Sequence, residues 1–120
     1  MSDHIRIERH NGREIWIADY SNLAFKELEF KFEIAKKKVI NSGRDNLLWI
    51  DIATGVKMNR QTGDALRSFA NEAKPFIKEY AAVGVSGFVR PFATMLRVAG
   101  LFNVKLFDTE QEAIEFLKTC

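Results

Sequence analysis

The stretch Leu47-Leu-Trp-Ile-Asp-Ile52 decides the fold of this 120-residue chain, because it is a nearly unbroken apolar run of strand length. A strand that is apolar on both faces is typical of the middle of a sheet with helices on both sides. We therefore predict a central buried strand here. Asp51 falls at the end of this strand, where α/β sheets often place functional groups, although a lone carboxylate there more often caps the following loop.

A hairpin is predicted upstream of this strand. Ile5 and Ile7 alternate with polar residues, Asn11-Gly12 follows, and Ile15-Trp-Ile17 resumes the apolar run. Asn-Gly is the favoured pair for a two-residue type I′ turn, because both residues tolerate positive φ. The alternation in the first arm indicates one solvated face, so we expect the hairpin at the edge of the sheet.

The first helix is predicted over residues 23–40, with Gly43 as its stop. Its core stripe repeats every three or four residues and consists of Phe25, Leu28, Phe32, Ala35 and Val39. A second apolar set, Leu23, Phe30 and Ile34, lies about 140–180° away on a helical wheel. That second face needs a partner, which is another subunit, a ligand or a neighbouring element of the same fold.

The rest of the chain alternates helices and strands. A second helical stripe comprises Leu66, Phe69, Ala70, Ala73, Phe76, Ile77 and Tyr80, with a kink expected at Pro75. A strand over 81–85, a helix from Ser86-Gly87 to Ala99, a strand over 104–107 and a last helix capped by Asp108 or Thr109 follow. The order predicts a single α/β domain over residues 1–120, with a mixed sheet, an antiparallel hairpin, parallel βαβ units and about four helices.

Composition narrows the function classes. The 18 Lys and Arg are scattered among 16 Asp and Glu, so no nucleic acid partner is expected. The one cysteine, Cys120, permits no internal disulfide and fits a reducing compartment. Residues 1–4 contain no apolar signal core, and no stretch approaches the roughly 18 apolar residues of a transmembrane helix. We expect a cytoplasmic protein.

No catalytic set is found in the sequence. The only histidines, His4 and His10, have no cysteine or carboxylate at ligand spacing. Ser86 has no partner histidine and lacks the Gly-x-Ser-x-Gly pattern. We therefore predict no enzymatic activity, no metal and no cofactor.

The segment Gly84-Val-Ser-Gly-Phe-Val-Arg90 is a candidate anion site. Ser86 and Gly87 would lie at a helix N-terminus, with Arg90 one turn on and Arg97 on the same face. The alternative is a serine cap with two solvated arginines. The inner stripe of this helix, Phe88, Phe92, Met95, Leu96 and Ala99, is either core or, if the helix moves as a lid, one wall of an apolar pocket.

Four stretches, 46–52, 73–78, 82–87 and 105–110, carry a family resemblance. They resemble STAS-like proteins related to the bacterial sporulation anti-anti-sigma factor, called SpoIIAA-like, in the branch grouped with lipid-transfer-like domains. The resemblance covers nearly the whole chain, and its motifs are structural. It implies a mixed sheet of four or five strands with packed helices, and a role in protein–protein or small-ligand signalling.

The resemblance also implies a candidate phosphorylation switch. In the anti-anti-sigma factors an Asp-Ser-Ser/Thr-Gly stretch after the central strand opens the next helix, and its second hydroxyl residue is phosphorylated. The comparable stretch here is Arg60-Gln-Thr-Gly63, with one residue inserted near Thr54. Only Thr62-Gly63 is retained, so Thr62 is either the switch or a threonine that caps the helix.

These observations lead to two functional hypotheses. The first is a non-enzymatic regulatory or adaptor module that binds a regulatory protein partner or forms a homodimer through Leu23, Phe30 and Ile34. The alternative is a carrier or sensor of a small apolar or anionic lipid-like ligand, held by Arg90 and the aromatic stripe.

Overall fold

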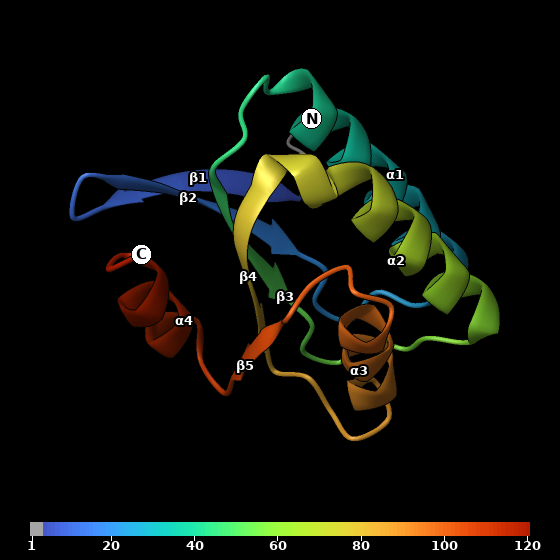
Figure 1. Ribbon diagram of the computed structural model, residues 1–120. Helices are drawn as coiled ribbons and strands as arrows, with labels where there is room; N and C mark the ends of the chain where they lie inside the picture. Colours follow the sequence, from blue (N-terminus) through green and yellow to red (C-terminus); the bar gives the residue numbers. More distant parts are fainter. Residues whose placement is uncertain (1–3) are drawn as a thin grey trace.

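A five-stranded mixed sheet with helices on both faces forms the centre of the protein, as a computed structural model shows for residues 4–120 (Figure 1). The strands are β1 (Ile5–His10), β2 (Arg13–Asp19), β3 (Leu47–Ile52), β4 (Ile77–Val83) and β5 (Lys105–Phe107). The helices are α1 (Phe25–Asn41), α2 (Arg60–Ala73), α3 (Arg90–Val98) and α4 (Glu110–Leu117). Residues 1–3 lie outside the described residues. The prediction that residues 1–4 contain no apolar core of a signal peptide falls mainly on them.

The strands lie in the sheet in the order of the chain, from β1 to β5. β1 pairs antiparallel with β2, and every later pair is parallel. Asn11 and Gly12 join β1 to β2 with φ values of 54° and 78°, as a type I′ turn requires. The predicted mixed α/β fold, its edge hairpin and its parallel units are confirmed.

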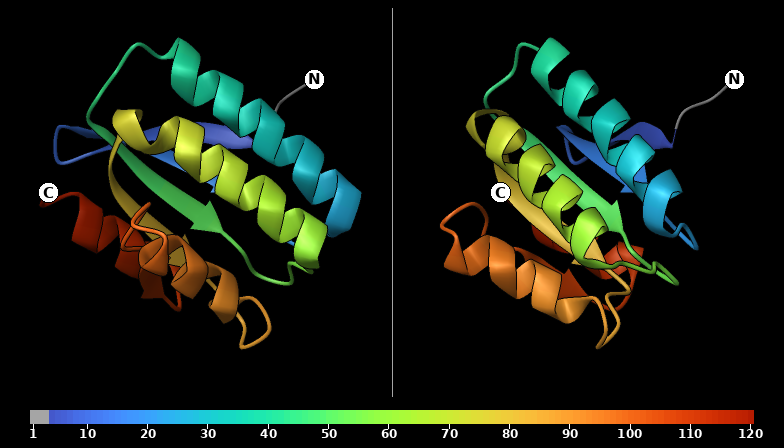
Figure 2. Two further views of the ribbon diagram at one scale, coloured as in Figure 1. Left: turned by 45° about the vertical axis from the view of Figure 1, so that its right-hand side comes forward. Right: turned by 90° about the vertical axis from the view of Figure 1, so that its right-hand side faces the viewer.

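The sheet separates two hydrophobic cores. α1, α2 and α3 cover one face, with α1 toward the β1 edge and α3 toward β5, and α4 covers the other (Figure 2). β3 contributes to both cores, since Trp49 packs under α1 and α2 while Leu48 and Ile50 pack toward α4. This double coverage explains the unbroken apolar run and confirms the predicted central strand.

Within residues 4–120, no helix has the length and apolar character needed to cross a membrane.

The predicted second helix is too long, because α2 ends at Ala73 and Ile77 and Tyr80 belong to β4. Pro75 lies in a short 3₁₀ turn, Lys74–Phe76, that ends the helix. The register between β3 and β4 then skips one residue, so that Ile77 and Tyr80 both face the same core despite their spacing of three. A bulged strand thus reproduces helical spacing, which is why the sequence pattern was misleading.

The assignment of Phe25 to the core stripe of the first helix is also wrong. Phe25 is the first residue of α1, has a φ of 51° and is 43% exposed. The other four members of that stripe are buried. The helical spacing predicts burial correctly inside the helix. It does not hold for the first residue, because the backbone there is not helical.

Candidate functional site

Asp51 is buried at the end of β3 and is the acceptor at the centre of a polar cluster. Its carboxylate accepts a hydrogen bond from the indole N–H of Trp49, at 2.8 Å, and another from the hydroxyl of Tyr80. Trp49 lies two residues earlier on the same face of β3, and its register partner on β4 is Tyr80. Both donors are side chains of the sheet, and among residues 4–120 no hydrogen bond from the loop after β3 reaches this carboxylate.

Burial raises the pKa of Asp51 from 3.8 to about 7, and the hydrogen bonds from Tyr80 and Trp49 act in the opposite direction. A carboxyl group with a pKa near 7 is present in both protonation states at neutral pH. It accepts hydrogen bonds when ionised and can also donate one when protonated. The Asp51 carboxyl group can therefore act as a hydrogen-bond acceptor or as a donor toward a molecule beside it.

Tyr20 adds an unsatisfied hydroxyl to this cluster. Its side chain is 2% exposed, and within residues 4–120 its hydroxyl has no hydrogen-bond partner. Burial raises the pKa of Tyr20 above 10, and the nearby Asp51 raises it further. The hydroxyl is therefore a neutral donor, and a buried donor without an acceptor costs free energy until a group accepts a hydrogen bond from it.

These polar groups line a cavity of about 50 Å³ between the sheet and the helices on that face. Apart from Tyr20, Asp51 and Tyr80, the side chains that line it are apolar. The helices contribute Leu28 and Phe32 from α1, Leu66 from α2, and Phe92 and Leu96 from α3. The space is large enough for only a few water molecules, whereas ligand pockets usually measure roughly 300–1,000 Å³. A larger ligand would therefore require α3 to move.

α3 forms the outer wall of this cavity and has few anchors. Leu96 is its only fully buried residue, and no side chain caps its first turn. At its start, Phe92 packs directly against Gly63 of α2, where an added Cβ would lie 2.4 Å from the phenylalanine ring. Gly63 is therefore needed for close contact between α2 and α3, a role that the sequence analysis missed.

The predicted anion-binding residues are exposed and do not line the cavity. Ser86, Gly87, Arg90 and Arg97 all face solvent. α3 begins at Arg90, later than predicted, and Ser86 contributes its carbonyl to the preceding turn rather than a side-chain cap. The serine cap of the alternative interpretation is therefore wrong, its two solvated arginines are observed, and the anion site stays a prediction.

Phe88, assigned to the inner stripe of this helix, lies in the turn before α3 and is 94% exposed. Ala99, from the same stripe, is also exposed. Leu96 is buried, and Phe92 and Met95 are half-buried against the core. The stripe is therefore partly core, and the late start of α3 puts Phe88 outside the helix.

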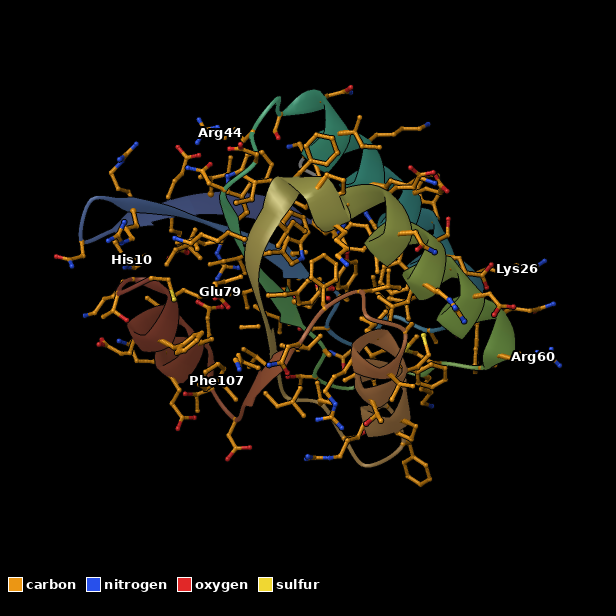
Figure 3. The ribbon with its side chains drawn as sticks, viewed as in Figure 1. His10, Lys26, Arg44, Arg60, Glu79 and Phe107 are labelled. Carbon is orange, nitrogen blue, oxygen red and sulfur yellow. The ribbon has the colours of Figure 1, made fainter. Side chains whose placement is uncertain are left out.

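Thr62 is fully buried at the start of α2. Asn59 is the N-cap, and its side chain accepts a hydrogen bond from the Thr62 N–H at 3.0 Å. The Thr62 hydroxyl in turn accepts from the Asn59 N–H. Arg60, which replaces the acidic residue of the family motif, points away from the molecule (Figure 3). Phosphorylation of Thr62 would require this first turn to open, and it stays a prediction.

Replacing Thr62 by Val should lower the free energy of unfolding by about 1–2 kcal/mol. The change keeps the volume of the buried side chain but leaves the Asn59 N–H without its acceptor. Urea unfolding measures the loss. Thr94→Val on the exposed face of α3 is the matched control and should change little. Equal losses in the two variants would contradict the capping role.

The predicted interface set does not form one exposed face. Phe30 is 65% exposed, Ile34 is half-buried, and Leu23 packs partly against the core. Besides Phe25 and Phe88, the other large apolar side chains with exposed surface are Ile7 at 49%, Ile40 at 39% and Val98 at 79%. Within residues 4–120, no three His, Cys, Asp or Glu side chains gather in a group able to hold a metal ion.

Comparison with known proteins supports the fold. No protein-family model and no curated protein matches the chain. An uncharacterized DUF3478-family protein with a SpoIIAA-like fold from Shewanella loihica PV-4 is similar in structure, with a TM-score of 0.68 and 15% identity over 94% of this chain and 91% of that one. An anti-sigma-factor antagonist (STAS) domain protein from Planctomyces limnophilus has a TM-score of 0.62 and 13% identity, over 98% and 99% of the chains.

The sheet order and the helices on its two faces therefore define an α/β protein with a STAS-like fold. More specifically, the fold is SpoIIAA-like. The predicted resemblance is confirmed at the level of fold.

Proposed function

We propose that this protein is a non-enzymatic binding module that takes a small, mainly apolar ligand into the cavity under α3. The observation that carries the proposal is the buried Tyr20 hydroxyl, which has no partner within residues 4–120 and lies at a cavity that Asp51 and Tyr80 also line. A ligand group that accepts a hydrogen bond from Tyr20 would relieve a cost of about 1–3 kcal/mol. The apolar walls would hold the rest of the ligand.

The charge of the cluster favours a neutral polar group on the ligand. Above pH 7 Asp51 is ionised, and a carboxylate or phosphate placed beside it would be repelled. A hydroxyl or carbonyl group accepts from Tyr20 without that penalty, and a hydroxyl can also donate to Asp51. Among the predicted lipid-like ligands, we therefore favour neutral ones such as fatty alcohols.

Octanol should bind to the wild-type protein, and Tyr20→Phe should weaken this binding about threefold to tenfold. The variant removes only the hydroxyl. It keeps the aromatic ring, whose centroid lies 5.0 Å from that of the Phe32 ring. A neutral hydrogen bond of about 1 kcal/mol corresponds to this factor. Isothermal titration at pH 8 measures the affinity.

Octane is the matched ligand control, because it fills the same apolar space without a polar group. Its binding should be nearly the same in the wild type and in Tyr20→Phe. The proposal fails if neither compound binds, and the role of Tyr20 fails if the variant weakens octanol and octane equally.

A second candidate function is regulatory association with another protein chain, including a second copy of this one. Exposed Phe30 on α1 supports it, together with the structural likeness to a protein described as an anti-sigma-factor antagonist. Large apolar side chains left in water often mark an interface. Ile34 extends this apolar surface by one turn of α1.

A further inference from the structure

Within residues 4–120, β1 pairs with β2 alone, so its other side forms an edge of the sheet. The N–H of Asp19 donates to the carbonyl of His4 at 2.9 Å, and the register of β1 and β2 runs without a break from that pair to the turn. In an antiparallel ladder, alternate residues direct their backbone groups to the neighbouring strand. Arg6 and Glu8 therefore bond to β2, whereas Ile7 and Arg9 direct their N–H and C=O groups to the open edge.

The side chains along this edge have a charge pattern that is complementary to itself. Arg6 and Glu8 lie on the α4 face, where the guanidinium of Arg6 contacts Glu8 at 2.7 Å and Glu110 of α4 at 2.5 Å. Ile7 lies between them on the opposite face and is 49% exposed. When a second β1 runs in the opposite direction with Ile7 opposite Ile7, its Glu8 lies opposite Arg6 and its Arg6 lies opposite Glu8.

We propose that β1 pairs antiparallel with β1 of a second copy of this chain, about a two-fold axis at Ile7. The two Ile7 residues would then exchange backbone hydrogen bonds, and each Arg6 would lie opposite the second copy's Glu8. The five strands of each copy would form one continuous sheet. This inference rests on the second candidate function, self-association, and gives it a surface and a register.

Other antiparallel registers of the same edge are less favourable. An axis at Arg6 would place the two arginines opposite each other, and an axis at Glu8 would do the same for the two glutamates. Like charges directly opposite each other in a sheet are destabilising. The register about Ile7 places both pairs of opposite charges face to face, which is why a second copy fits this edge.

The helix α1 supports the same arrangement. It lies on the β1 side of the sheet (Figure 2), and its Lys31 borders the same surface depression as Ile5 and Arg6. A two-fold axis perpendicular to the sheet places the second copy's α1 on the same face, antiparallel to the first. On α1, Ile34 lies about 60° around the helix from Lys31 and Phe30 about 100°, so Ile34 is the apolar residue nearer to the second copy's helix.

Charge reversal tests this register. Arg6→Glu and Glu8→Arg each place like charges opposite each other twice in a dimer, so each should weaken self-association at least about tenfold in sedimentation equilibrium. A mixture of the two variants should form a heterodimer with an affinity near that of the wild type, because every cross-copy pair is then opposite in charge. The double variant should also dimerise.

The controls separate the edge from the fold and from α1. Glu110→Gln removes the other partner of Arg6 without changing the edge and should dimerise normally. A wild-type chain that stays monomeric at every concentration would overturn both this inference and self-association. A dimer that is lost in Phe30→Asp but is unaffected by the two charge reversals would overturn the β1 register and leave association through α1 standing.

Discussion

Replacing Asp51 by Asn should abolish a fall in stability that the wild-type protein shows as the pH rises from about 4 to about 7. The Asp51 pKa is 3.8 in the unfolded chain and about 7 in the folded one. Between these values the folded state keeps a proton that the unfolded state has released, so the free energy of unfolding decreases by about 1.4 kcal/mol for each pH unit. The full difference is about 4 kcal/mol, and it is complete above pH 7.

The sign of this effect is set by burial, which disfavours the ionised carboxylate more than its two hydrogen bonds favour it. Well below pH 4 both states are protonated, and the contribution of Asp51 to the free energy of unfolding is then at its highest. Asn has a similar shape, keeps one acceptor for Trp49 and cannot ionise. Urea unfolding of both proteins at several pH values between 4 and 8 gives the difference directly.

Asp64→Asn is the control for this measurement, because Asp64 is exposed on α2. Its stability should follow that of the wild type across the whole pH range. The free energy of unfolding of Asp51→Asn and of the wild type could instead change in parallel between pH 4 and pH 8. That result would show that Asp51 does not titrate near neutrality in the folded protein.

Replacing Leu96 by Ala should lower the free energy of unfolding by about 3 kcal/mol and make octanol bind more tightly. Leu96 is 2% exposed and is the fully buried residue that holds α3 over the cavity. Removing its side chain costs transfer free energy and leaves a larger hole. The hole adjoins the existing cavity, and apolar cavities enlarged in this way can bind small apolar molecules.

Val98→Ala is the matched control on the same helix, because Val98 is 79% exposed. It should change the stability by less than about 0.5 kcal/mol and leave octanol binding unaltered. If Leu96→Ala weakened octanol binding while the protein remained folded, α3 would contribute to the bound state in a way that the cavity under it does not explain.

The sequence predicted the elements whose signals are local. Asn11-Gly12 predicts the hairpin turn, and the backbone there has the positive φ values that the turn needs. Thr109, one of the two predicted caps of the last helix, is its N-cap and forms a capping box with Glu112 at the start of α4. These features depend on residues within a few positions of each other, so their chemistry can be recognised before the chain is folded.

The sequence also identified parts of the cavity without showing that they meet. Asp51 was a candidate because it ends the central strand, and Leu96 was assigned to an inner stripe. Tyr20 cannot be recognised from the sequence, since a single tyrosine after a strand has no distinctive pattern. Tyr80 was placed in a helix, because the bulge in β4 gives it the spacing of a helical residue.

Local pattern alone determined the order of strands and helices, the buried central strand and the edge position of the hairpin. Tertiary structure alone decided that Tyr20, Asp51 and Tyr80 line one cavity and that β2, rather than β1, pairs with β3. The physical reason is distance along the chain. Hydrogen bonds within a turn or cap act between close neighbours, whereas Asp51 and Tyr80 are 29 positions apart and meet only because β3 and β4 pair side by side.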